Sequence, residues 1–337
     1  MSERKPQDLD VASLMGMGLH LEIAKLIGEP INQQLPVPVE LGEIADTFTA
    51  EPGEHVWRYE NIDDNVDVVL KVDPNCLITP IKRTPLNDVE VTFDGYNSKL
   101  EYVCVEDILN KVDTDILARR KASITRAMDK GELKNILDAL LTPTSTYFPA
   151  NDADNNEVTV ATADDLYDVI VRMKHKIEDY GDDFILLVGS TVKEKLDTYD
   201  KDNVTSFNYN ITIQNRLAQM GIKVMKVFGK VSIPASGGDA ETEEAMLDTN
   251  KLILIARNSR IAEGKPIKFV RRKISPEIAR MMGADVDSAQ RAIIVNPVPV
   301  QDNGNRLAFG VYGYESRIFL ITNSKAISVA DATVIVS

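Results

Sequence analysis

The sequence has few of the side chains that most often carry metal or covalent chemistry. Its 337 residues include only three histidines and two cysteines. His20, His55 and His175 lie in three separate segments, and none has a partner at metal-ligand spacing. Cys76 and Cys104 form no metal or redox motif, which indicates a reducing, intracellular origin. These absences exclude the familiar zinc, thiol and histidine-based catalytic motifs.

Basic charge and long apolar runs are also scarce. Lys and Arg number 38 against 52 Asp and Glu, so the formal net charge is −14. Such a surface argues against a protein whose main task is to grip nucleic acid or an anionic membrane, since both need clustered cations. No stretch is long and apolar enough to span a bilayer. Val11–Leu21 comes nearest to a signal-peptide core, but Asp8 and Asp10 precede it, so we expect the chain to be cytosolic where it is made.

Passages that look like ligand-binding motifs each lack an essential residue. Gly189–Thr191 and Gly229–Ser232 resemble pieces of a phosphate loop, but neither has the required glycine spacing before Lys and Ser or Thr. Asp152–Asn156 opens like a calcium loop, but Glu157 stands where glycine is needed and Ala163 where a bidentate carboxylate is needed. The sequence therefore assigns no catalytic, cofactor-binding or metal-binding residue, and it predicts a protein that is not an enzyme.

The stretch Asp113–Leu141 predicts one long amphipathic helix. Pro143 ends it, because proline lacks the amide donor and disfavours helical geometry in its predecessor. The helix would be about 40 Å long, against a radius of gyration of about 20 Å for a globule of this size. It therefore predicts a spine that crosses the molecule. Its apolar side chains recur at three- and four-residue steps: Ile116, Leu117, Ile124, Ala127, Met128, Ile136, Leu137, Leu140 and Leu141.

Two features of this helix bear on function. Gly131 lies in its interior, where glycine costs up to about 1 kcal/mol relative to alanine. Gly131 predicts either a bend in the spine or a site of close packing or mere tolerance. Arg119–Lys121 and Arg271–Lys273 are the two basic clusters of the chain, and Arg119–Lys121 falls on the polar face of the helix. We expect that cluster to be solvated, with a weak approach to a polyanion as the second reading.

The sequence before the spine alternates like β-strands. Glu54–Glu60 and Val66–Val72 predict a long hairpin, and Asp88–Phe93 with Lys99–Glu106 predicts a second one around a turn at residues 94–98. The first hairpin would expose Trp57 and Tyr59 on one strand and Val68 and Leu70 on the other. A two-stranded hairpin is marginal alone in water, so we expect these four residues to lie at a contact between subunits.

The sequence after the spine reads as mixed α/β. Residues 142–156 form a loop that marks a domain boundary, and Ser236–Glu244 predicts a mobile acidic loop at the tip of the second domain. A helix over Ala163–Tyr180, capped by Thr162, would bury one apolar face. The other predicted helices are Ser190–Tyr199 and Ile211–Met220. The predicted strands are Phe184–Val188, Ile222–Phe228, Leu252–Ala256, Ile267–Arg272, Arg291–Val300, Leu307–Tyr314 and Ser316–Ile321.

Three passages, taken with this order of elements, resemble the major capsid protein of tailed bacteriophages, whose fold encapsulins share. Leu35–Trp57 looks like the run from arm into extended loop. Ala163–Leu196 looks like the helix, turn, buried strand and following helix of that family's axial domain. Met220–Ile233, followed by Leu252–Ala256 and Leu307–Ile321, looks like its remaining strands.

The resemblance implies an α+β capsid fold in four parts. Residues 1–40 would be an N-terminal arm and 41–87 an extended loop. Residues 88–156 and 257–337 would form a peripheral domain with the spine helix over 113–141, and 157–256 would form the axial domain.

The function implied is structural. Many copies would assemble through hexamers and pentamers into an icosahedral virion head around double-stranded DNA, made in the host cytoplasm. Expected partners are other copies, a separate scaffolding protein, portal and decoration or completion proteins, and DNA through weak contact only; no cofactor and no membrane are expected. The alternatives are an encapsulin-type compartment shell or a soluble α/β enzyme with an unfamiliar site.

Overall fold

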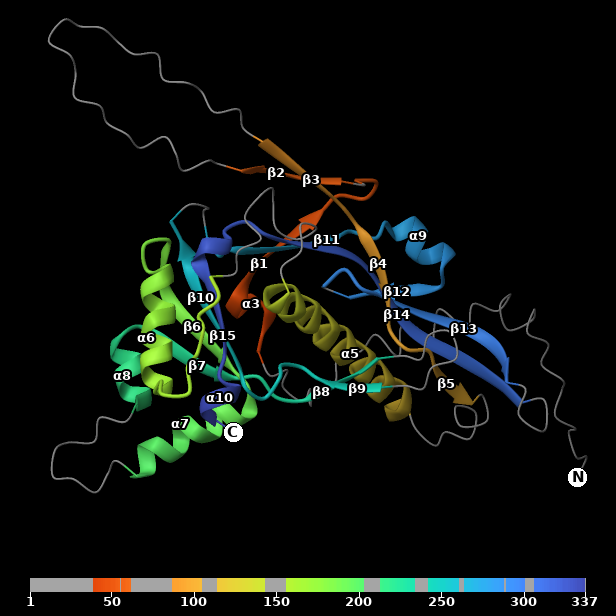
Figure 1. Cartoon of the computed structure of the whole chain (residues 1–337). Helices are drawn as coiled ribbons and strands as arrows, with labels where there is room; N and C mark the ends of the chain where they lie inside the picture. The colour runs from red at the N-terminus through yellow and green to blue at the C-terminus, as the bar shows by residue number, and fades with distance from the viewer. Residues whose placement is uncertain are drawn as a thin grey trace, which may run out of the picture.

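The computed structural model describes residues 39–54, 56–61, 87–104, 114–142, 156–202, 213–233, 242–260, 264–287, 289–300 and 306–336. They form a mixed α+β fold, as the sequence predicts. Two larger sheets lie on either side of one long helix, α5 (Thr114–Leu141), whose bounds match the predicted spine to within one residue (Figure 1).

A four-stranded sheet lies at the centre of one half of the molecule. Its strand order is β15-β10-β6-β7, and β6 and β7 are parallel. Leu186 and Leu254 face one core, whereas Ile185 and Ile253 face another. Because both faces are covered, these strands are unbroken apolar runs rather than alternating ones. The strands are β6 (Gly181–Val188), β7 (Ile222–Lys226), β10 (Lys251–Ser259) and β15 (Ile327–Asp331).

Three helices cover one face of this sheet: α6 (Leu166–Ile177), α7 (Ser190–Asp202) and α8 (Ile213–Gln219) (Figure 1). The predicted apolar face of α6 is confirmed, because one face of the helix is buried through Leu166, Val169, Ile170, Met173 and Ile177. The predicted cap at Thr162 is wrong. Asp165 caps α6 by accepting a hydrogen bond from the Tyr167 amide at 3.3 Å, because residues 161–164 form a turn closed by Asp164.

The end of the described chain also belongs to this sheet, whereas the resemblance implies that residues 257–337 belong to the peripheral domain. β15 pairs with β10, preceded by η2 (Ser324–Ala326) and followed by α10 (Thr333–Val336). The side-chain amide of Asn156 donates to the carbonyls of Lys325 and Ile327 at 3.0 and 3.1 Å. Sequence position alone does not assign β15 to the four-stranded sheet, because only its tertiary pairing with β10 brings it there.

The second sheet has seven strands and is organised by β14 (Arg306–Ile321). β14 is one continuous 16-residue strand, so the predicted break at Tyr314-Glu315 is wrong. It pairs with β13 and β5 along its first half, with β4 across residues 314–317 and with β11 along its second half. Where the side chains of β14 change from apolar to charged, β4 pairs with the strand and keeps its backbone hydrogen-bonded. The other elements are β4 (Asp94–Asn97), β5 (Glu101–Cys104), β11 (Ile267–Arg272), α9 (Pro276–Met281), β12 (Ala284–Val286) and β13 (Ala292–Val300).

Residues 41–50 belong to the seven-stranded sheet and not to the extended loop that the sequence predicts. They form α3 (Leu41–Ile44) and β1 (Ala45–Ala50), and β1 pairs in parallel with β11. Ile44 and Ala45 are fully buried in the core around α5. The apolar pair at 44–45 is too short to signal a core strand by periodicity, and its partner lies more than two hundred residues along the chain.

The predicted hairpins have the wrong partners. β2 (Val56–Asn61) pairs with β3 (Asn87–Thr92), and the predicted partner Val66–Val72 lies outside the described residues. β4 and β5 both pair with β14, so the predicted second hairpin and its turn are wrong. Alternation identifies a strand but does not choose its partner.

A further pair, β8 (Lys230–Ile233) with β9 (Thr242–Ala245), lies beside α5 (Figure 1). The Lys130 ammonium on α5 donates to the Lys230 carbonyl at 3.3 Å. Residues 242–244 are therefore a strand against the long helix and not part of a loop at a domain tip; residues 234–241 lie outside the described residues. The negative charge of Glu244, 3.6 Å from Lys134, is neutralised there.

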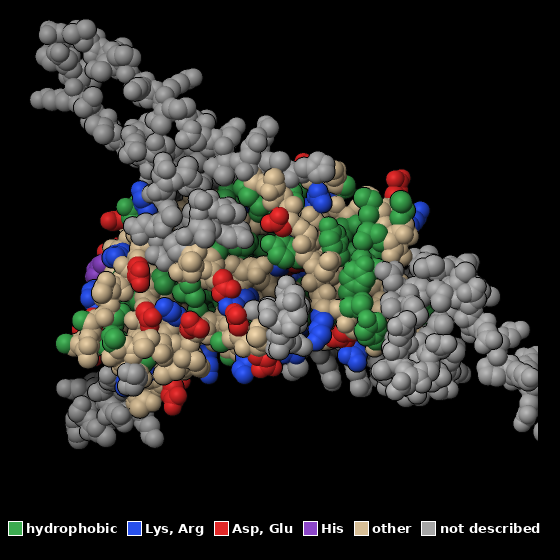
Figure 2. Space-filling view, turned by 45° about the vertical axis from the view of Figure 1, so that its right-hand side comes forward, with side chains coloured by type: hydrophobic (Ala, Val, Ile, Leu, Met, Phe, Trp, Pro, Cys, Tyr) green, Lys and Arg blue, Asp and Glu red, His purple; other side chains and the backbone are tan. Residues whose placement is uncertain are grey.

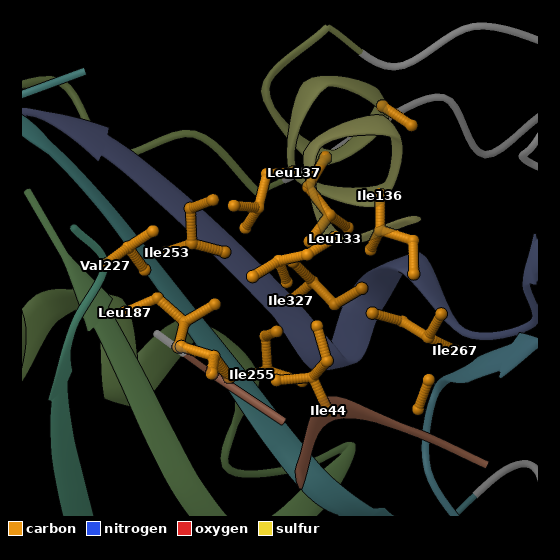
Figure 3. Close-up of a cluster of buried hydrophobic side chains, with 14 of the residues drawn as sticks. Ile44, Leu133, Ile136, Leu137, Leu187, Val227, Ile253, Ile255, Ile267 and Ile327 are labelled. Atoms are coloured by element: carbon orange, nitrogen blue, oxygen red, sulfur yellow. The ribbon is translucent and has the colours of Figure 1, made fainter. Parts of the chain in front are cut away.

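The main core lies where α5 meets both sheets. Leu133, Ile136 and Leu137 point from α5 toward Ile253 and Ile327 of the four-stranded sheet, with Ile44 and Ile267 nearby (Figure 3). Toward its N-terminal end, α5 packs on β14 through Ile124 and Met128. A Cβ at Gly313 of β14 would lie 2.4 Å from Met128 Sδ and 2.8 Å from Ile124 Cγ2. Gly313 thus allows the close approach of helix and sheet.

Gly313→Ala should lower the free energy of unfolding by about 1–3 kcal/mol, because the added methyl overpacks the contact between α5 and β14. Denaturant unfolding of the full chain measures this. Gly42→Ala is the matched control, because a Cβ at Gly42 meets nothing within 4 Å. Equal stability of the two variants would show that α5 moves away from β14 without cost.

Candidate functional site

The predicted interface residues fall on or beyond β2. Of Trp57 and Tyr59 the structure describes only the backbone, paired with Val91 and Val89 of β3. Val68 and Leu70 lie outside the described residues. The contact between subunits that these residues predict therefore stays a prediction.

Gly131 lies in the continuous helix α5. A Cβ built there would meet only Arg317 Nη2, at 4.0 Å, which is ordinary contact distance. Close packing in this state does not require glycine at this position. The predicted bend stays a prediction.

The most distinctive polar site is a buried charge network between α5 and the seven-stranded sheet. Its centre is Glu132, which is only 2% exposed. Arg271 of β11 donates to both carboxylate oxygens of Glu132 through Nη2, at 2.8 and 2.7 Å, and through Nε at 3.0 Å. Arg291, just before β13, donates to Glu132 Oε1 at 2.8 Å. One carboxylate on the helix therefore holds two strands of the sheet.

The network continues through β14. Arg291 also donates to Asp129 at 2.5 Å and, through Nε, to Glu315 at 3.2 Å. Arg317 Nη1 lies 2.7 Å from Glu315 Oε1, and the Arg317 guanidinium stacks 4.1 Å from the centroid of the Tyr96 ring. Three arginines thus face three carboxylates, and the formal charges balance.

Burial and pairing shift the pKa values of these groups in different directions. Burial alone would raise the pKa of Glu132, but Arg291 and Arg271 hold it below its ordinary value. Burial raises the pKa of Asp129, although Arg291 opposes the shift. Burial and the neighbouring Glu132 raise the pKa of Glu315 to about 7. The three carboxyls are therefore not equivalent.

Sequence reasoning missed this network. Asp129 and Glu132 are three residues apart on a helix, and Glu315 and Arg317 are two apart on a strand, so each pair shares a face with apolar neighbours. Charged residues at such positions indicate buried ion pairs. Only the fold shows that these four residues are part of one network. Arg271 was assigned to a basic cluster, whereas each member of Arg271–Lys273 has a partner: Glu132, the Glu54 carbonyl and Glu51.

The cluster Arg119–Lys121 is likewise partly paired. Arg120 contacts Glu101 of β5 at 2.7 Å, and Lys121 lies 3.8 Å from Asp285 of β12. These contacts at the helix surface are worth at most about 1 kcal/mol each. Two of the three cations therefore serve intramolecular pairs.

An open hollow of about 590 Å³ lies beside α7, lined by Ser190, Lys193, Glu194, Asp197, Thr198 and Lys226. Lys193 is already paired with Asp197. Within the described residues no group of His, Cys, Asp and Glu is arranged to hold a metal ion, and no described helix could cross a membrane.

Hydrophobic and charged side chains are unevenly spread over the surface. Figure 2 shows a band of hydrophobic side chains on its right-hand part and charges of both signs mixed over its left-hand part. Exposed large apolar residues include Met281 on α9, at 87% exposure, and Tyr102 on β5, at 51%. Contiguous apolar surface of this kind is typical of protein interaction sites.

Glu132→Gln should lower the free energy of unfolding by about 3–5 kcal/mol, because it leaves Arg271 and Arg291 without their shared carboxylate. Chemical denaturation of the full chain measures the loss. Glu157→Gln, at an exposed residue, is the matched control and should stay within about 0.5 kcal/mol of the parent. A loss of similar size in both variants would mean that the network adds nothing specific.

Comparison with known proteins gives a match in fold. No family model and no curated protein matches the sequence. The capsid of an empty GTA particle aligns with a TM-score of 0.55 at 12% identity, over 90% of this chain and 92% of that chain. A phage-related protein from Bordetella bronchiseptica RB50 aligns with a TM-score of 0.53 at 10% identity, over 94% and 98% of the two chains.

An encapsulin complex from Synechococcus elongatus PCC 7942 covers 98% of this chain and 96% of its own at 11% identity, but its TM-score of 0.46 carries no argument. At these identities the likeness concerns the fold alone. The chain has a mixed α+β fold similar to that of solved phage-type capsid proteins, which confirms the resemblance seen in the sequence.

Proposed function

We propose that this protein is the subunit of a shell that assembles from many copies, through hexamers and pentamers, into an icosahedral head around double-stranded DNA. The observation that carries the proposal is the match to a GTA capsid over 90% of this chain and 92% of that one. A match over nearly the whole of both chains supports a shared architecture and not a shared module.

The parts of the fold suit this role. In the proposal α5 is the spine helix, the seven-stranded sheet is the peripheral domain, and the four-stranded sheet with α6, α7 and α8 is the axial domain. β2, β3 and the chain between them form the extended loop, and residues 1–40 the arm. In the proposal residues 41–50 join the peripheral domain and residues 324–336 join the axial domain, because β1 pairs with β11 and β15 pairs with β10.

The proposed partners follow from charge and from surface. A net charge of −14 suits weak, non-specific contact with packaged DNA, since tight binding needs clustered cations. Other copies would cover the apolar surface. A separate scaffolding protein, a portal and decoration or completion proteins are the remaining partners in the proposal, which places assembly in the host cytoplasm.

Electron microscopy and sedimentation of the full chain, expressed alone and with a scaffold, test the proposal. We expect capsomers or closed shells. A monodisperse monomer at micromolar concentration, without particles even beside a scaffold, would overturn it. The content of the purified particles distinguishes a virion head from an encapsulin-type compartment. Nuclease-resistant DNA inside the particles supports a virion head, whereas a packaged protein supports an encapsulin-type compartment.

Trp57→Ala should reduce assembly while leaving the subunit folded, because the proposal places this side chain at a contact between subunits. Sedimentation measures assembly, and circular dichroism with thermal unfolding measures folding. Phe184→Ala is the contrasting control, because Phe184 is buried in the core beside α6 and its truncation should cost about 3–5 kcal/mol of folding stability. If Trp57→Ala unfolds the subunit and the remaining folded protein assembles normally, the extended-loop assignment is wrong.

Gly131→Ala should raise the stability of the described state by up to about 1 kcal/mol, because alanine favours the helix and its methyl has room. If the spine must bend in another state of the shell, the same variant should assemble but convert poorly between shell forms. Thermal unfolding and particle diameter measure the two effects. Normal conversion with raised stability would leave mere tolerance as the reason for the glycine.

A further inference from the structure

The buried network brings two carboxyl groups onto the same arginines. Glu315 of β14 and Glu132 of α5 are both almost fully buried, and Arg317 Nη1 lies 2.7 Å from Glu315 Oε1 and 3.8 Å from Glu132 Oε1. Arg291 bridges them, reaching Glu132 through Nη2 at 2.8 Å and Glu315 through Nε at 3.2 Å. Two carboxylates held this close interact favourably only when one of them carries a proton.

The two carboxyls differ in how well arginine supports their charge. Glu132 receives hydrogen bonds from Arg271 and Arg291, one of them forked. Glu315 accepts a single, longer hydrogen bond from Arg291, and Arg317 Nη1 makes no well-directed hydrogen bond. The proton therefore belongs on Glu315, and Glu132 keeps the charge.

Several described elements bring charged groups close to Glu315, and β4 places Tyr96 opposite Glu315 and Asp94 opposite Arg317. α5 brings Asp129 and Glu132, β11 brings Arg271, the residue before β13 is Arg291, and β14 itself brings Arg317. Asp129 pairs with Arg291 at the more exposed edge of the network. Glu315 therefore lies among three arginines and two other carboxyl groups, those of Glu132 and Asp129.

We propose that Glu132 and Glu315 share one proton at the joint between α5 and the seven-stranded sheet, and that its release as the pH rises loosens α5 from the sheet. Release leaves both buried carboxylates charged on the arginines that they share, so the helix and the strand repel each other there. The contact between α5 and the seven-stranded sheet is then tighter on the acid side of neutrality than on the alkaline side.

The direction of the effect follows from linkage. The pKa of Glu315 is about 7 in the folded chain, against an ordinary value of 4.5 that applies to the unfolded chain. At a pH between these two values the folded chain therefore holds one proton more than the unfolded chain. Stability therefore rises as the pH falls from about 8 toward 5. The pKa of Glu132 is lowered in the folded chain. When the pH falls below the ordinary pKa of a glutamate and through this lowered value, Glu132 gains a proton and the stability that its charge contributes is lost.

Two measurements on the full chain test the proposal, under conditions where sedimentation shows a single species. The infrared band of a protonated carboxylic acid should be present at about pH 6 and absent at about pH 8.5, and Glu315→Gln should abolish it. Amide hydrogen exchange in α5, corrected for the intrinsic rate, should be several-fold faster at the higher pH, while exchange in α6 should not change.

Glu315→Gln imitates the protonated state, so its α5 amides should exchange slowly at both pH values. Glu132→Gln removes the carboxylate that the arginines need, so its α5 should exchange rapidly at both. Glu157→Gln is the control and should behave like the parent chain. The proposal is overturned if the infrared band persists in Glu315→Gln, or if Glu315→Gln loosens α5 as much as Glu132→Gln does.

Discussion

The structure depends on burying the charged face of α5. A helix that lies between two sheets must hide Asp129 and Glu132 as well as its leucines, and an unpaired buried carboxylate costs several kcal/mol. The cations that offset this cost come from three places in the sheet, at Arg271, Arg291 and Arg317. The network is complete only when β11, β13 and β14 lie side by side against the helix, so it couples the position of the helix to the register of the sheet.

The two halves of the molecule are not independent domains. The core around α5 takes side chains from both sheets, and the chain crosses between the sheets three times: from β5 through α5 to β6, from β10 to β11, and from β14 to β15. At the last crossing Thr322 donates to the Pro266 carbonyl at 3.0 Å and Asn323 donates to Ser259 at 2.8 Å, so the last two crossings are tied to each other. The two halves are therefore joined through packed side chains of one shared core.

Local elements could be predicted from the sequence, but their partners could not. α5, the inner face of α6 and the buried strands follow from periodicity, and their bounds agree with the structure to within a few residues. The errors concern pairing: β3 joins β2, β5 joins β14, and β15 returns to β10. Residue alternation sets which face of a strand is apolar, whereas the partner is set by tertiary packing. The charge network could not be predicted for the same reason, because Glu132 and Arg291 meet only when segments distant in sequence come together.

The parallel pairing of β1 with β11 has a consequence for biosynthesis. Ala45 is aligned with Ile267 and Ala50 with Arg272, so β1 waits for a partner made more than two hundred residues later. Contacts between segments so distant in sequence close late and slow folding, and an unpaired strand edge invites association in the meantime. The nascent chain carries this exposed edge until β11 has left the ribosome. The rate of synthesis, and whatever shields β1 during it, therefore sets how many chains reach the folded state.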